Sequence, residues 1–205
     1  MANEAERTAT SWAGTPLADR RSQRRARLVD AAFTLFGTQG EAGVSVRAVC
    51  RVAHLHARYF YESFPGTDDL LGAVYDQAAA ELADHLQAAL GAAGDGLAAR
   101  LRTGIRTVLD FSSADPRRGR VLFTEARANP VLASRRQATQ TALMNSVLQE
   151  EARTRPTADP RQVRVRAAMF TGAMVELVQQ WLAGTLGDDL DAVVDHAAAL
   201  LFPQP

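Results

Sequence analysis

Apolar residues recur at helical spacing along nearly the whole chain, and this periodicity limits the fold more than any other feature of the sequence. The first apolar stripe predicts a helix over residues 20–37 and consists of Leu28, Ala31, Ala32, Leu35 and Phe36. Later stretches repeat the pattern, and glycine or proline separates them. Because no alternating apolar run is flanked by hairpin turns, the sequence predicts an all-α protein.

The composition is that of a folded globular chain. Its 205 residues are 47% hydrophobic and 22% charged, which excludes disordered and low-complexity classes. The single cysteine, Cys50, cannot form an intramolecular disulfide, and the first residues lack the layout of a secretory signal. Since no apolar run reaches the roughly 20 residues that span a bilayer, we expect a cytoplasmic protein without a membrane partner.

Charge is distributed unevenly, although the chain is neutral overall. Residues 20–60 hold eight arginines and two acids, a net charge of +6, and the remainder is correspondingly acidic. A basic end on an acidic body indicates that this end binds a polyanion.

Two short helices follow the first one closely. Ser45 can cap a helix over residues 46–52, and a three-residue turn leads to a second over residues 56–61. A protruding helix held by another is what reading a DNA major groove requires. The side chains able to bind bases or phosphates are His56, Arg58, Tyr59, Tyr61 and Ser63. Alternatively, this aromatic-rich helix belongs to the core.

The last two helices carry more apolar residues than one neighbouring layer can bury. Residues 163–181 hold two apolar stripes about 100° apart. We expect one stripe to face the chain's own core and the other a second copy, in a four-helix dimer interface. The residues assigned to that interface are Thr171, Val175, Val178, Leu182, Val193, Val194, Ala197 and Leu201. The alternative is a central helix buried from both sides within a monomer.

Metal binding and catalysis are the competing interpretations. Cys50, His54 and His56 are close in sequence, but a tetrahedral site needs a fourth ligand. No nucleophile elbow, metalloprotease motif or P-loop occurs, and the glycine-rich residues 91–96 lie between helices. We therefore expect no enzyme, no metal and no cofactor.

Residues 27–71 resemble the helix-turn-helix of the tetracycline-repressor (TetR) family of bacterial transcription regulators. The matching landmarks are Ala31, Ala32, Phe36, Gly40, Val44, Ser45, Val46, Ala53, Phe60, Tyr61, Phe64, Leu70 and Leu71. Residues 1–19 are small, polar and aperiodic, which predicts a flexible arm. For the rest of the chain the resemblance implies a DNA-binding domain over 20–66 and an all-helical effector-binding and dimerisation domain over 67–205.

The resemblance also implies site residues. The positions at which the family contacts phosphates are occupied here by Ser45, Arg47, Tyr61 and Thr67. The positions at which it reads bases are residues 56–59, which include Ala57. Within that stretch, Arg58 is the strongest candidate for contact with a guanine edge. The family usually has glycine in place of His54 and lysine in place of Thr67. Large residues that can line an effector pocket are Phe111, Phe123, Met144, Phe170 and Met174.

We therefore expect a ligand-responsive repressor that binds a palindromic operator in double-stranded DNA as a homodimer. An unknown small molecule would release it from DNA by binding better to the conformer with misplaced reading helices. The alternative is a ligand-independent, architectural DNA-binding protein.

Overall fold

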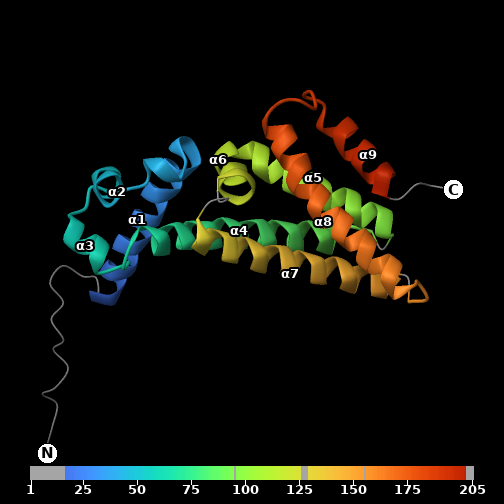
Figure 1. Ribbon diagram of the computed structural model, residues 1–205, viewed down its shortest axis with the longest axis horizontal. Helices are drawn as coiled ribbons and strands as arrows, with labels where there is room; N and C mark the ends of the chain where they lie inside the picture. The colour runs from blue at the N-terminus through green and yellow to red at the C-terminus, as the bar shows by residue number, and fades with distance from the viewer. Residues whose placement is uncertain (1–16, 95, 126–128, 155, 202–205) are drawn as a thin grey trace, which may run out of the picture.

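The computed structural model describes residues 17–94, 96–125, 129–154 and 156–201, and this part of the chain contains helices and no strand. The predicted all-α class is therefore confirmed. Figure 1 shows how the helices are arranged. The elements are α1 (Leu17–Gln39), a 3-10 turn η1 (Glu41–Gly43), α2 (Val46–Ala53), α3 (Ala57–Tyr61), α4 (Thr67–Ala92), α5 (Leu97–Ala114), α6 (Pro116–Gly119), a π-helical turn η2 (Arg120–Thr124), α7 (Pro130–Thr154), α8 (Pro160–Leu182) and α9 (Leu190–Leu201).

Several predicted boundaries differ from the observed ones. Helix α1 begins at Leu17, so residues 17–19, assigned to the arm, are helical, whereas residues 1–16 lie outside the described part. The sequence pattern also predicts one helix over about 117–128, where the structure has the short α6 followed by the wider turn of η2. Residues 126–128 also lie outside the described part.

Helices α1 to α3, called the head here (residues 17–66), share one core with α4. Leu28, Phe36 and Phe60 are fully buried in the same apolar cluster as Leu70 of α4. Helix α4 runs along the long axis of the molecule from the head, with α7 beside it (Figure 1). The head is therefore fixed to the rest of the chain by packing as well as by the chain connection.

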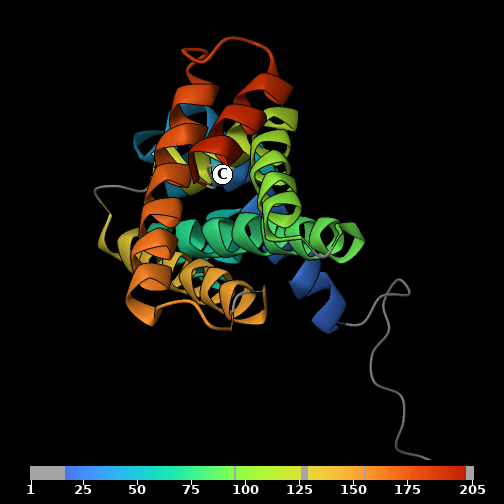
Figure 2. The same ribbon diagram turned by 90° about the vertical axis from the view of Figure 1, so that its right-hand side faces the viewer.

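The body (residues 67–201) contains a second apolar cluster between α5, α8 and α9. Ile105, Leu109, Val178 and Val194 are fully buried in it. Arg102 and Arg106 of α5 pair with Asp195 and Asp191 of α9, which keeps α9 against α5. Figure 2 views α5, α8 and α9 from the end of the molecule that is opposite the head.

Each helix of the described residues is too short or too polar to span a lipid bilayer.

Candidate DNA-binding surface

The turn between α2 and α3 depends on one left-handed residue. Ser45 caps α2 by accepting a hydrogen bond from the Ala48 amide at 3.2 Å. At the other end His54 has φ 52° and ψ 47°, and the Leu55 amide donates to the Cys50 carbonyl at 3.0 Å. Histidine tolerates this conformation better than branched residues do. The chain therefore leaves α2 sharply and enters α3 at a steep angle.

Helix α3 has an apolar inner side and a polar outer side. Phe60 and Phe64 are buried, with ring centroids 6.1 Å apart. The side chain of Arg58 is 82% exposed, and Tyr61 is 64% exposed. Phe60 and Phe64 thus hold α3 on the head while Arg58 and Tyr61 face outward.

The residues predicted to contact DNA fall into two groups. Those on the exposed surface of α2 and α3 are Ser45, Arg47, His56, Ala57, Arg58 and Tyr61. Those that are half-buried are Tyr59, Ser63 and Thr67. Ser63, just after α3, donates its hydroxyl proton to the Tyr59 carbonyl at 2.9 Å, so this proton is already bonded to the chain's own backbone.

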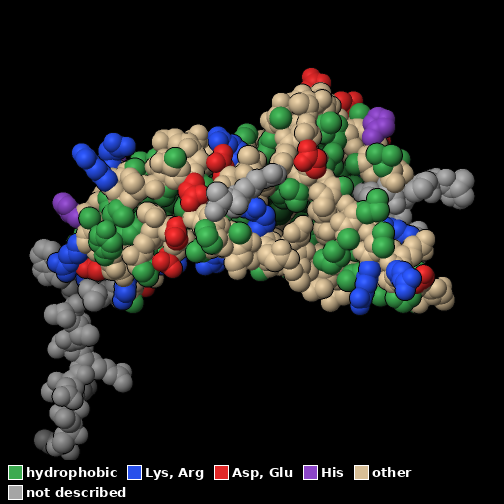
Figure 3. Space-filling view, viewed as in Figure 1, with side chains coloured by type: hydrophobic (Ala, Val, Ile, Leu, Met, Phe, Trp, Pro, Cys, Tyr) green, Lys and Arg blue, Asp and Glu red, His purple; other side chains and the backbone are tan. Residues whose placement is uncertain are grey.

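Arginines of α1 attach α2 and α3 to the first helix. Arg27 donates to the Ala53 carbonyl at 2.6 Å, and Arg21 donates to the Glu62 carbonyl at 2.9 Å. The guanidinium groups of Arg24 and Arg25 lie over the rings of Tyr59 and Phe64, at 4.7 and 4.6 Å from the ring centroids. Figure 3 shows arginine and histidine side chains on the surface at this end of the molecule.

Glu62 is a residue of this surface that the sequence interpretation missed. Its carboxylate accepts a hydrogen bond from Arg58 Nε at 2.8 Å and lies 3.8 Å from Arg24 Nη2. The hydrogen bond to Glu62 raises the pKa of the Arg58 guanidinium above its ordinary value. The i, i+4 spacing of Arg58 and Glu62 is the sequence signal that predicts such a pair.

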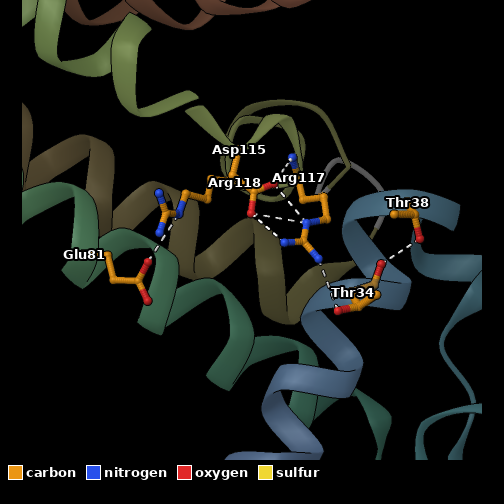
Figure 4. A network of polar contacts seen from close by, with 6 residues as sticks. All are labelled: Thr34, Thr38, Glu81, Asp115, Arg117 and Arg118. Carbon is orange, nitrogen blue, oxygen red and sulfur yellow. Dashed lines mark hydrogen bonds and ion pairs between the residues drawn. The ribbon is translucent and has the colours of Figure 1, made fainter. Parts of the chain in front are cut away.

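The head meets the body at a polar junction between α1 and the start of α6 (Figure 4). Arg117 holds the Asp115 carboxylate through Nη2 at 2.7 Å and reaches the Thr34 hydroxyl of α1 at 3.3 Å. Hydrogen bonding from Arg117 lowers the pKa of Asp115 below its ordinary value. A Cβ atom on Gly37 would lie 2.4 Å from the Arg117 Cβ, so glycine is needed for this close approach.

A second junction is centred on Asn129, which is 5% exposed. Its amide nitrogen donates to Glu41 Oε1 at 2.8 Å and to Asp68 Oδ1 at 2.9 Å. Its oxygen accepts from the amides of Val131 and Leu132, which caps α7. One buried side chain therefore connects the head, α4 and α7.

A cavity of about 220 Å³ adjoins the first junction, between α1, α4 and α6. Its lining includes Val29, Phe33, Val74, Ala78, Arg117 and Arg118, and none of the five residues predicted to line an effector pocket. Of those five, Phe111 is buried in the first cluster, and Phe170 and Met174 are buried in the second. Phe123 packs against both clusters, and Met144 is half-buried on α7.

Three of the residues assigned to a dimer interface are buried within the single chain. Thr171, Val178 and Val194 are at most 2% exposed. Half-buried positions are Val175, Leu182, Val193 and Ala197, and the Leu201 side chain lies outside the described part. Val165 and Met169 are large apolar residues at the surface of α8, 55% and 65% exposed.

Cys50 is buried, and burial raises the pKa of its thiol. The thiolate is the form that binds metals. Within the described ranges, no three histidine, cysteine or acidic side chains come together as potential metal ligands.

Residues 28–74 match the family model of bacterial regulatory proteins of the tetR family. No curated protein matches the sequence. Among solved structures, the chain is similar to the fatty acid degradation regulator FadR from Bacillus halodurans, with a TM-score of 0.75 and 18% identity over 88% of this chain and 95% of that one. The transcriptional regulator FadR from Bacillus subtilis, in complex with stearoyl-CoA, has the same TM-score and identity over 87% of this chain and 97% of that one.

A TetR-like transcriptional regulator from Rhodococcus sp. RHA1 has a TM-score of 0.72 and 19% identity over 92% of this chain and 97% of that one. At these identities the likeness establishes the fold. The predicted architecture, an N-terminal helix-turn-helix followed by a helical domain, is therefore confirmed.

Proposed function

We propose that the chain, a transcriptional regulator of the tetR family by its residues 28–74, is a ligand-responsive repressor that binds a palindromic DNA operator as a homodimer. Regulators of this family are generally not enzymes, and the proposal needs no catalytic step. Acting on bacterial DNA, the protein would work in the cytoplasm. We keep residues 20–66 as the DNA-binding domain and residues 67–205 as the effector-binding and dimerisation domain.

The observation that carries the DNA-binding proposal is the outer side of α3. Arg58 is 82% exposed at the side chain, and its Nε is held by Glu62. Bidentate contact from arginine to the O6 and N7 atoms of guanine is the commonest specific contact in a major groove. Exposed Ser45 and Arg47 at the start of α2 and Tyr61 on α3 are suited to the flanking phosphates.

The dimer proposal is supported by the outward side of α8. Val165, Ala168, Met169, Gly172 and Ala173 are exposed at spacings of three or four residues, and a Cβ on Gly172 would meet nothing within 4 Å. Small residues let two helices approach closely, and the exposed valine and methionine supply apolar area. We infer that this side of α8, together with α9, faces a second copy of the chain.

The effector proposal concerns the interior of the body. Phe123 packs against both apolar clusters, and the Gln179 amide donates to its carbonyl at 2.6 Å. A ligand that separates the clusters there would move η2, which is adjacent to the junction with α1. Because the Bacillus subtilis regulator is in complex with stearoyl-CoA, long-chain acyl-CoA compounds are the first class to test. A rise in melting temperature with such a compound supports a sensor, and no rise across a metabolite panel favours the ligand-independent alternative.

The DNA-binding proposal is tested with Arg58→Ala. We expect it to lose discrimination between an operator selected from random duplexes and scrambled DNA, by roughly 1–3 kcal/mol for each base pair that Arg58 reads. Titrations at one salt concentration measure the two affinities. If both fall equally, Arg58 contacts phosphate and does not read a base.

A further inference from the structure

Three arginines from two helices converge on Glu62, at the end of α3. Arg58 donates through Nε to Glu62 Oε1 at 2.8 Å, and Arg24 Nη2 lies 3.8 Å from Oε2. Arg21 donates to the backbone carbonyl of the same residue at 2.9 Å. This residue thus connects the exposed arginine of α3 to α1.

A carboxylate at this place has an electrostatic cost for DNA binding. Phosphates repel it, and it partly neutralises arginines that would otherwise attract the duplex. Glu62 therefore lowers the affinity for any DNA, whatever its sequence. The hydrogen bond with Arg58 does not by itself require a negative charge, because the side-chain oxygen of a neutral glutamine would accept the same hydrogen bond.

The geometry at Arg58 indicates what the carboxylate contributes. Within the described ranges, Arg58 donates through Nε to Glu62, and neither of its terminal nitrogens has a hydrogen-bond partner. These two nitrogens are the pair that makes a bidentate contact to guanine. An exposed arginine otherwise samples many rotamers, and ordering it on binding reduces affinity. Holding Nε fixes the plane of the guanidinium before DNA arrives.

Arg24 extends this support to α1. Its guanidinium lies 4.7 Å from the centroid of the Tyr59 ring and faces the second oxygen of Glu62. The side chain of Arg24 is 25% exposed, whereas that of Arg58 is 82% exposed. Glu62 is therefore anchored on its inner side and holds Arg58 on its outer side.

We propose that Glu62 is a positioning residue for sequence discrimination, which lowers affinity for all DNA and raises the preference of Arg58 for its operator. The inference rests on the proposed DNA-reading function of α3. It predicts that removing the Glu62 carboxylate raises the affinity for scrambled DNA and lowers the preference for the operator. Loss of a merely structural residue would instead weaken binding to operator and scrambled DNA alike.

The test uses Glu62→Ala and Glu62→Gln in the full chain, with Asp30→Asn as a charge-matched control. Asp30 is an exposed acid of α1 that lines the cavity between α1, α4 and α6, whereas Glu62 pairs with Arg58 of α3. The Glu62 variants should bind scrambled DNA more tightly, by about threefold, because they remove a negative charge beside Arg58, and Asp30→Asn should gain no more than that. Only the Glu62 variants should lose preference for the selected operator, by roughly threefold to tenfold for alanine and less for glutamine.

A double-variant cycle with Arg58→Ala completes the test. If Glu62 acts through Arg58, adding Glu62→Ala to Arg58→Ala costs no further discrimination. Additive losses, or a Glu62→Ala protein that keeps the wild-type ratio of operator to scrambled affinity, would overturn the inference. A wild-type protein with no preference among duplexes would instead overturn the proposed function itself, so the two failures are distinguishable. Melting curves for Glu62→Gln check that the head stays folded.

Discussion

The head and the body differ in what they leave on the surface. The head buries Phe36, Phe60 and Phe64 in one cluster with α4 and presents exposed Arg58 outward. The body closes a second cluster around Val178 but leaves Val165 and Met169 of α8 more than half exposed. The head is thus apolar inside and charged outside within one chain, while α8 has apolar area left over. The two surfaces suit different partners, a polyanion for the head and another apolar surface for the body.

The two regions are connected through polar groups at the end of α1 as well as through shared packing. Arg117 and Arg120 of the α6–η2 segment bond to Thr34 and to the Thr38 carbonyl of α1. On the other side of the same segment, Gln179 of α8 donates to the Phe123 carbonyl. The α6–η2 segment is therefore hydrogen-bonded to α1 on one side and to α8 on the other.

The largest effect is expected from Val178→Arg. Val178 is 0% exposed in the second cluster, so the substitution places an unpaired guanidinium in an apolar interior and should destabilise the fold by at least about 3 kcal/mol. Thermal unfolding followed by circular dichroism measures it. Val165→Arg, at a position 55% exposed in the single chain, should leave the chain folded and lose at most the stability that a second copy supplies. If Val178→Arg and Val165→Arg had the same melting temperature, α8 would not bury its Val178 side in the core as described here.

Met169→Arg should leave the chain folded and separate the two copies. Its side chain is 65% exposed in the single chain, so the added charge disturbs only a partner surface. Losing the second reading helix should weaken operator binding by about a hundredfold or more. Light scattering and operator titration measure the two effects together. Gln137→Arg, on the exposed side of α7, is the control and should remain dimeric and bind the operator like the wild type. If the Met169→Arg protein is still a dimer, the interface lies elsewhere.

Substitutions of Asn129 test the junction between the two regions. Asn129→Asp keeps an oxygen to cap α7 but points a carboxylate at Glu41 and Asp68, so we expect a loss of about 1–3 kcal/mol at neutral pH. Asn129→Ser, which can still cap α7 and adds no charge, should lose less stability. Urea titrations at neutral pH separate the two variants, and equal losses would contradict the repulsion between the carboxylates.

The smallest effect is expected at Asp115. Its pKa is lowered in the folded chain by the hydrogen bond from Arg117, relative to an ordinary value of 3.8. The stability that it contributes is therefore present above pH 3.8 and is lost as the pH falls through the folded-state pKa. Because the pair is partly exposed, the difference should stay below about 1 kcal/mol. Wild-type stability should fall more than that of Asp115→Asn between pH 6 and pH 3, and parallel curves would contradict the role of the pair.

Sequence reasoning succeeded where signals were local. Ser45 was predicted to cap α2 and does so, and His54, in the position where glycine is usual, adopts the left-handed backbone that this position requires. These features depend on a few neighbouring residues. The same reasoning overlooked the pairing of Arg58 with Glu62, although their spacing would have allowed it to be predicted.

Long-range features were less predictable. Helix α8 carries two apolar stripes, and the core takes residues from both, because Ala167, Phe170, Thr171, Met174 and Val178 are all buried. Periodicity alone does not determine which side of a helix with two apolar stripes faces the core. Likewise, the π-helical η2 and the bridge through Asn129 depend on packing between segments far apart in sequence. Neither has a local signature.

The most direct test of the account is the mass of the complex that the wild-type protein forms with its selected operator, measured by light scattering at micromolar concentration. A two-fold protein places its reading helices on half-sites about 34–36 Å apart, or a multiple of that. We predict two chains on each duplex and a selected sequence with two symmetric halves. One chain per duplex, bound with full preference for the operator, would contradict the dimeric reading mechanism.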